Sequence, residues 1–201
     1  GDIADVQIAY CPERVLPGKV LRELVENDRI IGGLSRRCTE RATEFYQIFV
    51  AGSCLPTEAN TAEMAKLTEN AFRDVNIAFA NELSLICDQL GINVWELIEL
   101  SNRHPRVNIL QPGPGVGGHC IAVDPWFIVD SAPAHARLIA MARAVNDGKP
   151  QWVIDKVKRA ADRFKNPVVA CLGLAFKPNI DDLRESPSLD IVDHLATEVS
   201  G

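Results

Sequence analysis

The 201-residue chain carries 21 basic and 27 acidic residues, a net charge of −6, and its 47% hydrophobic residues suffice for a core without disulfides. The acidic balance argues against a protein that binds nucleic acid or a membrane surface, since both partners favour basic patches, although a few arginines could hold an anionic small molecule. No apolar run approaches the length of a membrane span, and six scattered cysteines without a C-x-x-C pair indicate reduced thiols in a cytoplasm.

The first 55 residues alternate short apolar runs with turns, which predicts part of an α/β sheet. We expect strands at 6–10, 29–34 and 50–54, and a helix at 35–49 that Ser35 can cap. Glu13 lies in the loop at 11–18 after the first strand, where open α/β sheets place ligand groups. The alternative for Glu13 is a solvated loop carboxylate.

The longest periodic segment, residues 57–90, predicts one helix of about thirty residues. Thr57 or Asn60 can cap its start, and Gly91 suits the position after its end. A single helix of this length usually packs against a second domain or another subunit. Its apolar residues recur at steps of three and four: Met64, Leu67, Ala71, Val75, Phe79, Leu83, Ile86 and Leu90.

Two polar residues of this segment, Lys66 and Asn70, lie off the apolar stripe and share a face because they are four positions apart. Lysines are usually solvated, so a surface role is the alternative for Lys66. Asparagine is a poor helix former, which makes Asn70 in mid-helix a candidate for a specific contact.

The stretch 113–124 places four glycines within six positions, followed by Cys120 and Asp124. Glycine permits close backbone approach, and a thiol and a carboxylate at i, i+4 share a face if residues 120–129 are helical. One interpretation is a substrate cradle beside a nucleophile, and the other is a tight loop before a helix with a buried cysteine. The loop just upstream contains Arg103 and Arg106, which suit phosphate or carboxylate recognition or are simply solvated.

The remaining segments predict helices at 94–100, 134–147 and 152–164, and a second α/β unit from about residue 165. Residues 168–174 form a continuous apolar run typical of a buried parallel strand. Ser186 as N-cap and Pro187 at the first helical position predict a final helix, with apolar periodicity over 189–199. The whole reads as an α/β chain with an all-α middle.

Taken in order, these motifs resemble the UDP-glucose/GDP-mannose dehydrogenase family. The motifs that carry the resemblance are Cys11-Pro12-Glu13, Lys66-x-x-x-Asn70, Gly115-Val116-Gly117-Gly118-His119-Cys120-x-x-x-Asp124, Gly173-x-Ala175-Phe176-Lys177 and Asp182-x-Arg184-x-Ser186-Pro187. Within the family, Gly-Gly-His-Cys-Ile with Asn-Arg-His-Pro-Arg upstream resembles the branch that oxidises UDP-N-acetylhexosamines.

The resemblance implies three domains and the cofactor NAD. Residues 1–55 would be the tail of an NAD-binding Rossmann domain, 56–150 a long-helix dimerisation domain, and 151–201 the start of a second, UDP-sugar-binding Rossmann-like domain. It also implies a homodimer through the helix at 57–90. The Gly-x-Gly-x-x-Gly loop that cradles NAD in the family is absent from the 201 residues, so we expect a fragment that is inactive alone.

The family oxidises the C6 alcohol of a sugar nucleotide to a carboxylate with two NAD⁺, in cell-surface polysaccharide synthesis. The resemblance assigns the nucleophile to Cys120, the stabilisation of negative charge on oxygen to Lys66 and Asn70, and proton and water handling to Asp124 and Glu13. It places Arg14, Val15, Arg106, Asn108, Gly115, Gly117, Gly118, Phe176 and Lys177 at the substrate. It places Cys120 and Arg184 at the cofactor, and it implies no metal.

Two alternatives stay open. The substrate could instead be UDP-GlcNAc or UDP-glucose, because no residue visibly reads the sugar epimer. The chain could also be a non-catalytic dimerisation or nucleotide-sugar-binding module, which would bind without turnover.

Overall fold

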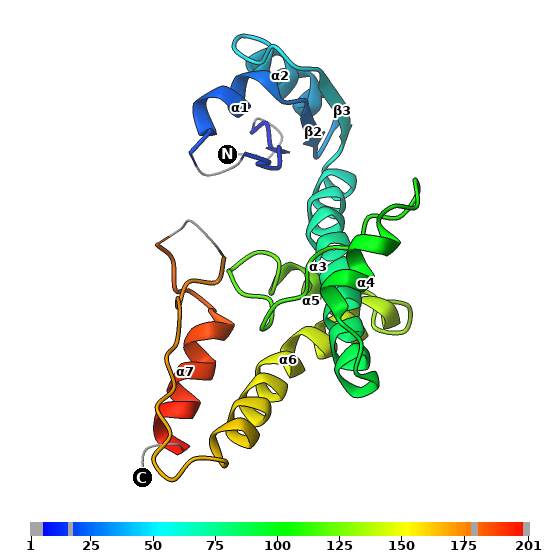
Figure 1. The fold of residues 1–201 in the computed structure, drawn as a ribbon. Coiled ribbons are helices and arrows are strands. Elements are labelled where there is room, and N and C mark those ends of the chain that lie inside the picture. The colour runs from blue at the N-terminus through cyan, green and yellow to red at the C-terminus, as the bar shows by residue number, and fades with distance from the viewer. Residues whose placement is uncertain (1–5, 16–17, 178–180, 199–201) are drawn as a thin grey trace. The chain divides into compact units, whose positions relative to one another are not determined.

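The computed structural model describes residues 6–15, 18–177 and 181–198. Residues 16 and 17 of the predicted loop, and the predicted helix end at residue 199, lie outside these ranges. The chain divides into two compact units, residues 1–69 and 70–201, and the division falls inside the long helix α3 (Ala59–Leu90). Figure 1 labels the elements of both units.

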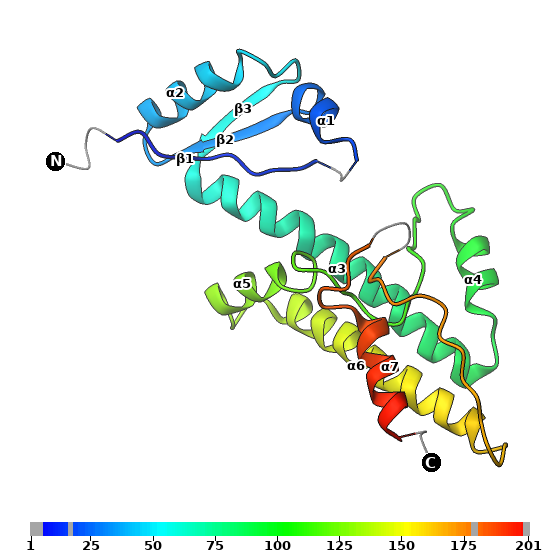
Figure 2. The same cartoon turned by 90° about the vertical axis from the view of Figure 1, so that its left-hand side faces the viewer.

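The first unit is a small α/β layer. Its three strands lie in the order β1-β2-β3, with β1 antiparallel and β3 parallel to the central β2, and α2 packs against β2 and β3 (Figure 2). The elements are β1 (Ala9–Tyr10), α1 (Val20–Glu26), β2 (Arg29–Gly33), α2 (Arg36–Tyr46) and β3 (Cys54–Glu58). The mixed α/β class predicted from the sequence is confirmed.

Local chemistry explains most of these boundaries. Ser35 caps α2 as predicted, since its hydroxyl accepts the Cys38 N–H at 3.3 Å. The prediction of a strand at 50–54 was wrong by four residues. The N–H groups of Ala51 and Gly52 bind the Val25 carbonyl instead, and pairing with β2 begins at Cys54. The sequence pattern missed α1 altogether.

The helix α3 starts directly after β3, so the predicted caps were wrong: Thr57 belongs to the strand, and Asn60 is already the second residue of the helix. Gly91 follows the helix with φ +70°, a left-handed conformation that glycine adopts without steric cost, as predicted. The predicted single long helix is confirmed over 32 residues.

The buried face of α3 combines small apolar residues with three polar ones, whereas many of its large apolar side chains are exposed. Asp74 and Asn81 are fully buried, and Ser84 is nearly so. Phe79 of the predicted stripe is 55% exposed, as are Met64, Ile86 and Leu90 in large part, and the neighbouring Phe72 is 70% exposed. The core-facing side of this helix therefore combines hydrogen bonds with the close packing of small side chains such as Ala71 and Ala78.

The partner of this polar face is α6 (Arg137–Ala161), which runs beside α3 in the same direction (Figure 2). The sequence predicted two helices here because Gly148 and Pro150 interrupt the pattern. The structure has one continuous helix with Pro150 inside it. Proline removes one backbone donor and crowds the carbonyl four residues earlier, so packing and polar contacts along α6 must offset this cost.

The contacts between α3 and α6 form a buried polar network. Arg143 donates to the Asp74 carboxylate at 2.6 Å, and the Asn146 amide donates to the same oxygen at 2.8 Å. Asn146 in turn accepts from the Asn81 amide at 2.8 Å, and the Lys149 ammonium donates to the Ser84 hydroxyl. Burial raises the pKa of Asp74, and the Arg143 charge opposes that shift.

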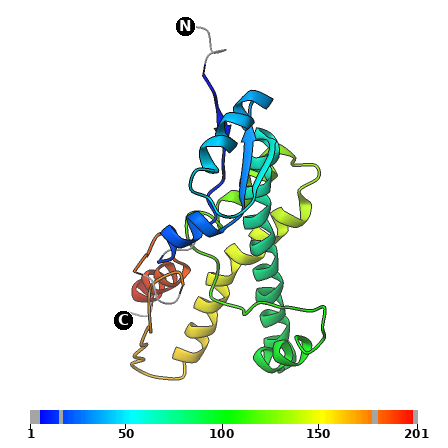
Figure 3. The ribbon, with the colours of Figure 1, turned by 90° about the horizontal axis from the view of Figure 1, so that it is seen from above.

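Three shorter helices complete the second unit: α4 (Val94–Ser101), α5 (Asp124–Ser131) and α7 (Pro187–Glu198). Asn93 caps α4 through its side chain. The helix α7 begins at Pro187 as predicted and lies against α6 through a small core of Ile154, Ile191 and Leu195 (Figure 3).

The predicted buried strand at 168–174 was wrong. The segment has no strand structure, and Val168 and Leu172 are each 96% exposed. A strand is stabilised by hydrogen bonds to a neighbour, and the described residues provide no strand that pairs with this segment. Its apolar composition alone does not make it fold.

Candidate active site

The glycine-rich stretch leads into α5 through one helical turn. Residues 119–123 form a turn, and the Asp124 N–H donates to the Cys120 carbonyl at 2.8 Å. The predicted helix over 120–129 therefore begins four residues later, at Asp124, but the i, i+4 relation between Cys120 and Asp124 is present. Cys120 is a free, half-buried thiol.

The Asp124 carboxylate is held by α3. The Asn70 side-chain amide donates to Asp124 Oδ2 at 2.5 Å in a partly buried setting. This bond joins two predicted site residues that are 54 positions apart. The bond fixes the Asp124 carboxylate, which lies one helical turn after the candidate nucleophile Cys120 in the chain.

A second charged group lies near Cys120. The Gly118 N–H donates to the Arg184 carbonyl at 3.3 Å, which holds Arg184 beside the loop two residues before Cys120. Hydrogen bonds and charge from Asp182 raise the pKa of the Arg184 guanidinium. The guanidinium binds the Asp182 carboxylate through two nitrogens, at 3.0 and 2.7 Å. These bonds lower the pKa of Asp182 to about 2. Arg184 is thus oriented by an ionised partner while its side chain stays largely exposed.

The glycines predicted as a substrate cradle are packed against protein. A Cβ at Gly117 would lie 2.3 Å from the Glu185 carbonyl oxygen and 2.6 Å from Phe176 Cβ. Gly118 has φ +85°, and a Cβ there would meet the Phe176 ring at 3.0 Å. Gly115 lies similarly against the Pro187 ring. These three glycines let the loop dock on the segments around Phe176 and the start of α7.

The loop that carries Arg106 and Asn108 is closed at its base. The Asn102 side chain accepts the Ile109 N–H at 2.7 Å and donates to the Ile109 carbonyl at 3.0 Å. The amide thus binds both backbone groups of one residue, as a neighbouring β-strand would. Arg106 and Asn108 lie exposed on the loop between these anchors, and Lys177 is likewise exposed. The sequence pattern did not identify Asn102.

The remaining predicted site residues belong to the first unit. Lys66 donates to the Glu13 carbonyl at 2.9 Å, so the helix residue holds the loop backbone. The Glu13 carboxylate accepts from the Arg14 N–H at 2.7 Å and from the buried Arg29 guanidinium at 3.1 Å. Burial alone would raise its pKa, but these hydrogen bonds and the Arg29 charge hold the pKa of Glu13 below its usual range.

The charge state of Glu13 limits its chemistry. A carboxylate with a lowered pKa is ionised near neutral pH and acts as a proton acceptor rather than as a donor. Arg14 pairs with Glu69 at 2.9 Å, and Val15 is half-buried beside it in the chain. Arg29, which orients Glu13, was not identified from the sequence because it reads only as the first residue of a strand.

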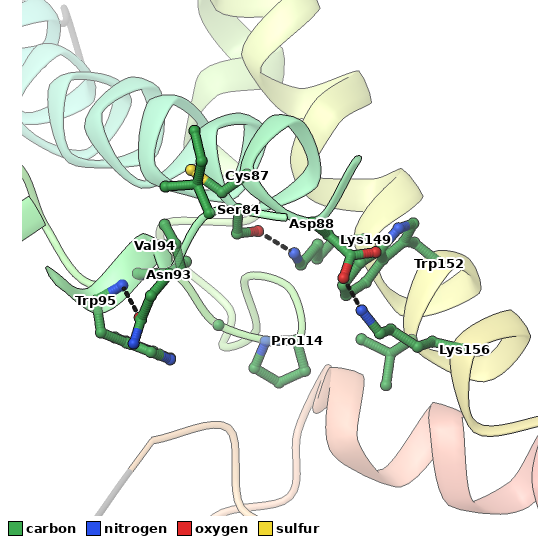
Figure 4. A pocket seen from close by; sticks show the side chains of 14 residues that line it. Ser84, Cys87, Asp88, Asn93, Val94, Trp95, Pro114, Lys149, Trp152 and Lys156 are labelled. Atoms are coloured by element: carbon green, nitrogen blue, oxygen red, sulfur yellow. Dashed lines mark hydrogen bonds and ion pairs between the residues drawn. The ribbon is translucent and has the colours of Figure 1, made fainter. Parts of the chain in front are cut away.

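A separate cavity of about 560 Å³ lies between α3, α4, α6 and the loop at Pro114, and it contains none of the predicted site residues (Figure 4). Lys149 lies in its wall, only 3% exposed, with its ammonium 4.2 Å from the centre of the Trp152 ring. Burial lowers the pKa of Lys149 to about 8. Among the described residues, no group of three or more His, Cys, Asp or Glu side chains is placed to hold a metal.

Three models of one family match successive parts of the chain. The NAD binding domain model matches residues 2–50, the central domain model matches 60–148, and the UDP binding domain model matches 170–200. The chain belongs to the UDP-glucose/GDP-mannose dehydrogenase family. Cys120, Asp124 and Asn70 all fall within the match to the central domain of this family.

Curated relatives are similar along the entire chain. An NDP-N-acetyl-D-galactosaminuronic acid dehydrogenase of Ralstonia nicotianae is 69% identical over 100% of this chain and 48% of its own length. A UDP-N-acetyl-D-mannosamine dehydrogenase of Campylobacter jejuni is 67% identical over 98% of this chain and 49% of its own length. The chain thus spans about half the length of the curated relatives it matches.

Solved structures of family members superpose well on this fold. A UDP-N-acetyl-mannosamine dehydrogenase of Staphylococcus aureus matches with a TM-score of 0.85 and 53% identity, covering 94% of this chain and 46% of the other. A UDP-D-ManNAc dehydrogenase of Pyrococcus horikoshii matches with a TM-score of 0.88 and 46% identity, with the same coverage.

The packing of the glycine-rich loop predicts a steric penalty at Gly117. In Gly117→Ala the new Cβ meets backbone and Cβ atoms that cannot turn away, so we expect a loss of about 1–3 kcal/mol in stability and a lower melting temperature by scanning fluorimetry. Gly148→Ala is the matched control, because nothing lies within 4 Å of its added Cβ and alanine favours the helix. Equal melting temperatures for the two variants would contradict the assigned packing.

The lowered pKa of Lys149 predicts that the free energy of unfolding depends on pH. Its pKa is about 8 when folded against 10.5 as its ordinary value, so the unfolded chain binds more protons between these two pH values. Its contribution to the free energy of unfolding should therefore rise as the pH rises through this window. Urea unfolding at about pH 7.5, 8.5 and 9.5 would measure it as the difference between wild type and Lys149→Met. Parallel pH profiles for the two proteins would refute it.

Proposed function

We propose that the protein is an NAD-dependent UDP-N-acetylhexosamine 6-dehydrogenase that oxidises the C6 alcohol to a carboxylate, with UDP-N-acetyl-D-mannosamine as substrate. The observation that carries the proposal is the Asn70–Asp124 hydrogen bond one helical turn from the free thiol of Cys120. A thiol, a carboxylate and an amide donor are the groups that two successive oxidations at one carbon require.

The residues near Cys120 fit a dinucleotide. Arg184 is joined to the loop through the Gly118 N–H, and its guanidinium is largely exposed and oriented by Asp182, which suits the negative charge of NAD. NAD, when bound, takes up one hydride in each of the two oxidations. Arg184 and the backbone around Cys120 would hold it.

In the proposed mechanism Cys120 attacks the C6 aldehyde formed by the first hydride loss, and a thiohemiacetal results. Loss of a second hydride from that carbon gives a thioester on Cys120. Water then adds, the carbon–sulfur bond breaks, and the acid leaves as the thiol takes back a proton. Asp124 and the ionised Glu13 accept protons from the water and the alcohol. Lys66 and Asn70 stabilise the negative charge that develops on oxygen.

The curated relatives are named for two different sugars. Relatives named for N-acetyl-D-mannosamine and for N-acetyl-D-galactosaminuronic acid are about equally similar to the chain, at 67% and 69% identity. A UDP-N-acetyl-D-galactosamine-type substrate is therefore the second candidate. UDP-GlcNAc and UDP-glucose remain alternatives from the sequence, as does a module that binds without turnover.

The chemistry is tested by NADH production from the full-length protein with UDP-ManNAc, UDP-GalNAc, UDP-GlcNAc and UDP-glucose. Cys120→Ser should lower the overall four-electron turnover by about a hundredfold or more, because serine is a poor nucleophile without an activating base. Cys171→Ser, at an exposed cysteine, serves as control and should retain activity. No turnover of any sugar by wild type, or full turnover by Cys120→Ser, would overturn the proposal.

We also propose that the protein is a homodimer joined through the exposed face of α3. Phe72, Phe79 and Ile86 recur every seven residues and therefore form one seam along the helix. Their exposed fractions are 70%, 55% and 43%, which leaves a row of large apolar side chains in water. A second copy of the same helix would bury this row.

Disruption of the seam should give monomers. The double variant Phe72→Glu/Phe79→Glu places charges in the buried centre of the proposed interface, so light scattering after size-exclusion chromatography should give half the wild-type mass. Leu21→Glu, at an 82% exposed position of α1, is the control and should leave the mass unchanged. A monomeric wild type, or a variant with wild-type mass, would show that α3 is not the dimer contact.

A further inference from the structure

Two asparagines on α3 hold the two ends of the segment that contains Cys120. Asn70 binds the Asp124 side chain, and Asn81 Oδ1 accepts the Gly113 N–H at 2.8 Å. The two asparagines are eleven residues apart, which at 3.6 residues per turn puts them within about 20° of each other on the helix surface. One face of one helix therefore sets both the start and the end of the stretch 113–124.

Asn81 is fully buried and uses both ends of its amide. Its nitrogen donates to Asn146 Oδ1 at 2.8 Å, while its oxygen accepts from Gly113. Its backbone carbonyl also accepts the Ser84 hydroxyl at 2.6 Å. The residue therefore connects the network between α3 and α6 to the backbone of the glycine-rich loop.

The network also fixes which way the Asn81 amide points. An ionised Asp74 carboxylate can only accept, so Asn146 must turn its nitrogen toward Asp74 and its oxygen toward Asn81. Asn81 must then present its nitrogen to Asn146, which leaves its oxygen for the Gly113 N–H. The negative charge of Asp74 thus determines the orientation of the Asn146 amide, which determines that of the Asn81 amide, whose oxygen then accepts from Gly113.

Between its two ends the loop is held by the glycine packing and by a backbone hydrogen bond from the Gly118 N–H to the Arg184 carbonyl at 3.3 Å. Figure 4 shows Pro114, the residue after Gly113, on the loop beneath Ser84 and Lys149. Loss of the hydrogen bond between Gly113 and Asn81 would detach the start of the loop from the polar network of α3 and α6, seven residues before Cys120.

We propose that Asn81 is a positioning residue for Cys120: it fixes the start of the glycine-rich loop and thereby the place of the thiol relative to Asp124. The catalytic part of this inference rests on the proposed dehydrogenase function. The positional part does not, since it concerns how the loop is held in the folded protein.

The test compares the two partners of the Gly113 hydrogen bond in the full-length protein. Asn81→Ala removes the acceptor. Gly113→Pro removes the N–H donor and fixes the backbone φ at this position, and it leaves the side chains between α3 and α6 unchanged. Gly113→Ala is the matched control, because it keeps the N–H and its Cβ has no neighbour closer than 3.8 Å. Asn76→Ala, on the same helix but outside the network, is the control for loss of an asparagine.

The readouts are the rate and pH profile of iodoacetamide alkylation at Cys120, measured by mass spectrometry, and the separate values of kcat and KM. We expect Asn81→Ala and Gly113→Pro to change the Cys120 alkylation rate about threefold or more and to lower kcat about tenfold to a hundredfold, with a smaller change in KM. Alkylation of the exposed Cys171 should be unchanged, as should all values for the two controls.

Wild-type alkylation and kcat in Asn81→Ala, or equal effects of Gly113→Ala and Gly113→Pro, would overturn the proposal. If Asn81→Ala fails to fold, the Gly113 pair decides the question alone. If the wild-type protein reduces no NAD with any sugar while Asn81→Ala still alters Cys120 alkylation, the proposed function fails and the positioning role stands.

Discussion

The buried ion pair of Asp74 and Arg143 is the interaction on which the second unit depends. Both side chains are at most 2% exposed, so neither charge can remain in place without the other. The pair joins α3 to α6, and because a carboxylate only accepts, it orders the amides of Asn146 and Asn81 that follow it. A charge at one point of the interface thus sets the orientation of neutral groups several residues away.

This arrangement explains why α3 has polar residues on its buried face while its largest apolar side chains are exposed. Polar residues facing α6 fix one register between two parallel helices, because a shift of one turn would leave Asp74 and Asn81 without partners. Apolar packing tolerates such slips more readily. The exposed stripe with Phe72 and Phe79 is then free to serve another contact.

The sequence predicted those structural features that are caused by neighbouring residues, and it failed where contacts between distant segments decide the structure. Ser35, Gly91 and Pro187 mark helix ends through their own backbone preferences, and the sequence predicted all three. Residues 168–174 have strand composition but no strand within the described residues to pair with, so composition misled. The helix α6 passes through Pro150 because contacts from distant segments hold both sides, which no local pattern reveals. For the site, motif spacing predicted Cys120, Asp124 and Asn70. Asn81 acts through the Gly113 backbone 32 residues away, and Asn102 through both backbone groups of Ile109, and neither contact follows from a sequence pattern.

The glycine-rich loop connects the candidate nucleophile to the segments expected to contact the substrate. Gly117 and Gly118 lie against Phe176 and Glu185, and the Ser186 hydroxyl donates to the Leu174 carbonyl at 2.5 Å, so the loop and both segments form one packed assembly. A side chain at either glycine would separate the nucleophile loop from this assembly. Glycine is therefore required there by the protein's own packing, whatever the substrate contributes. The glycine motif, which the sequence suggested as space for a sugar, also fixes the position of Cys120 relative to Phe176. A reaction with two successive steps at one carbon needs such a fixed geometry.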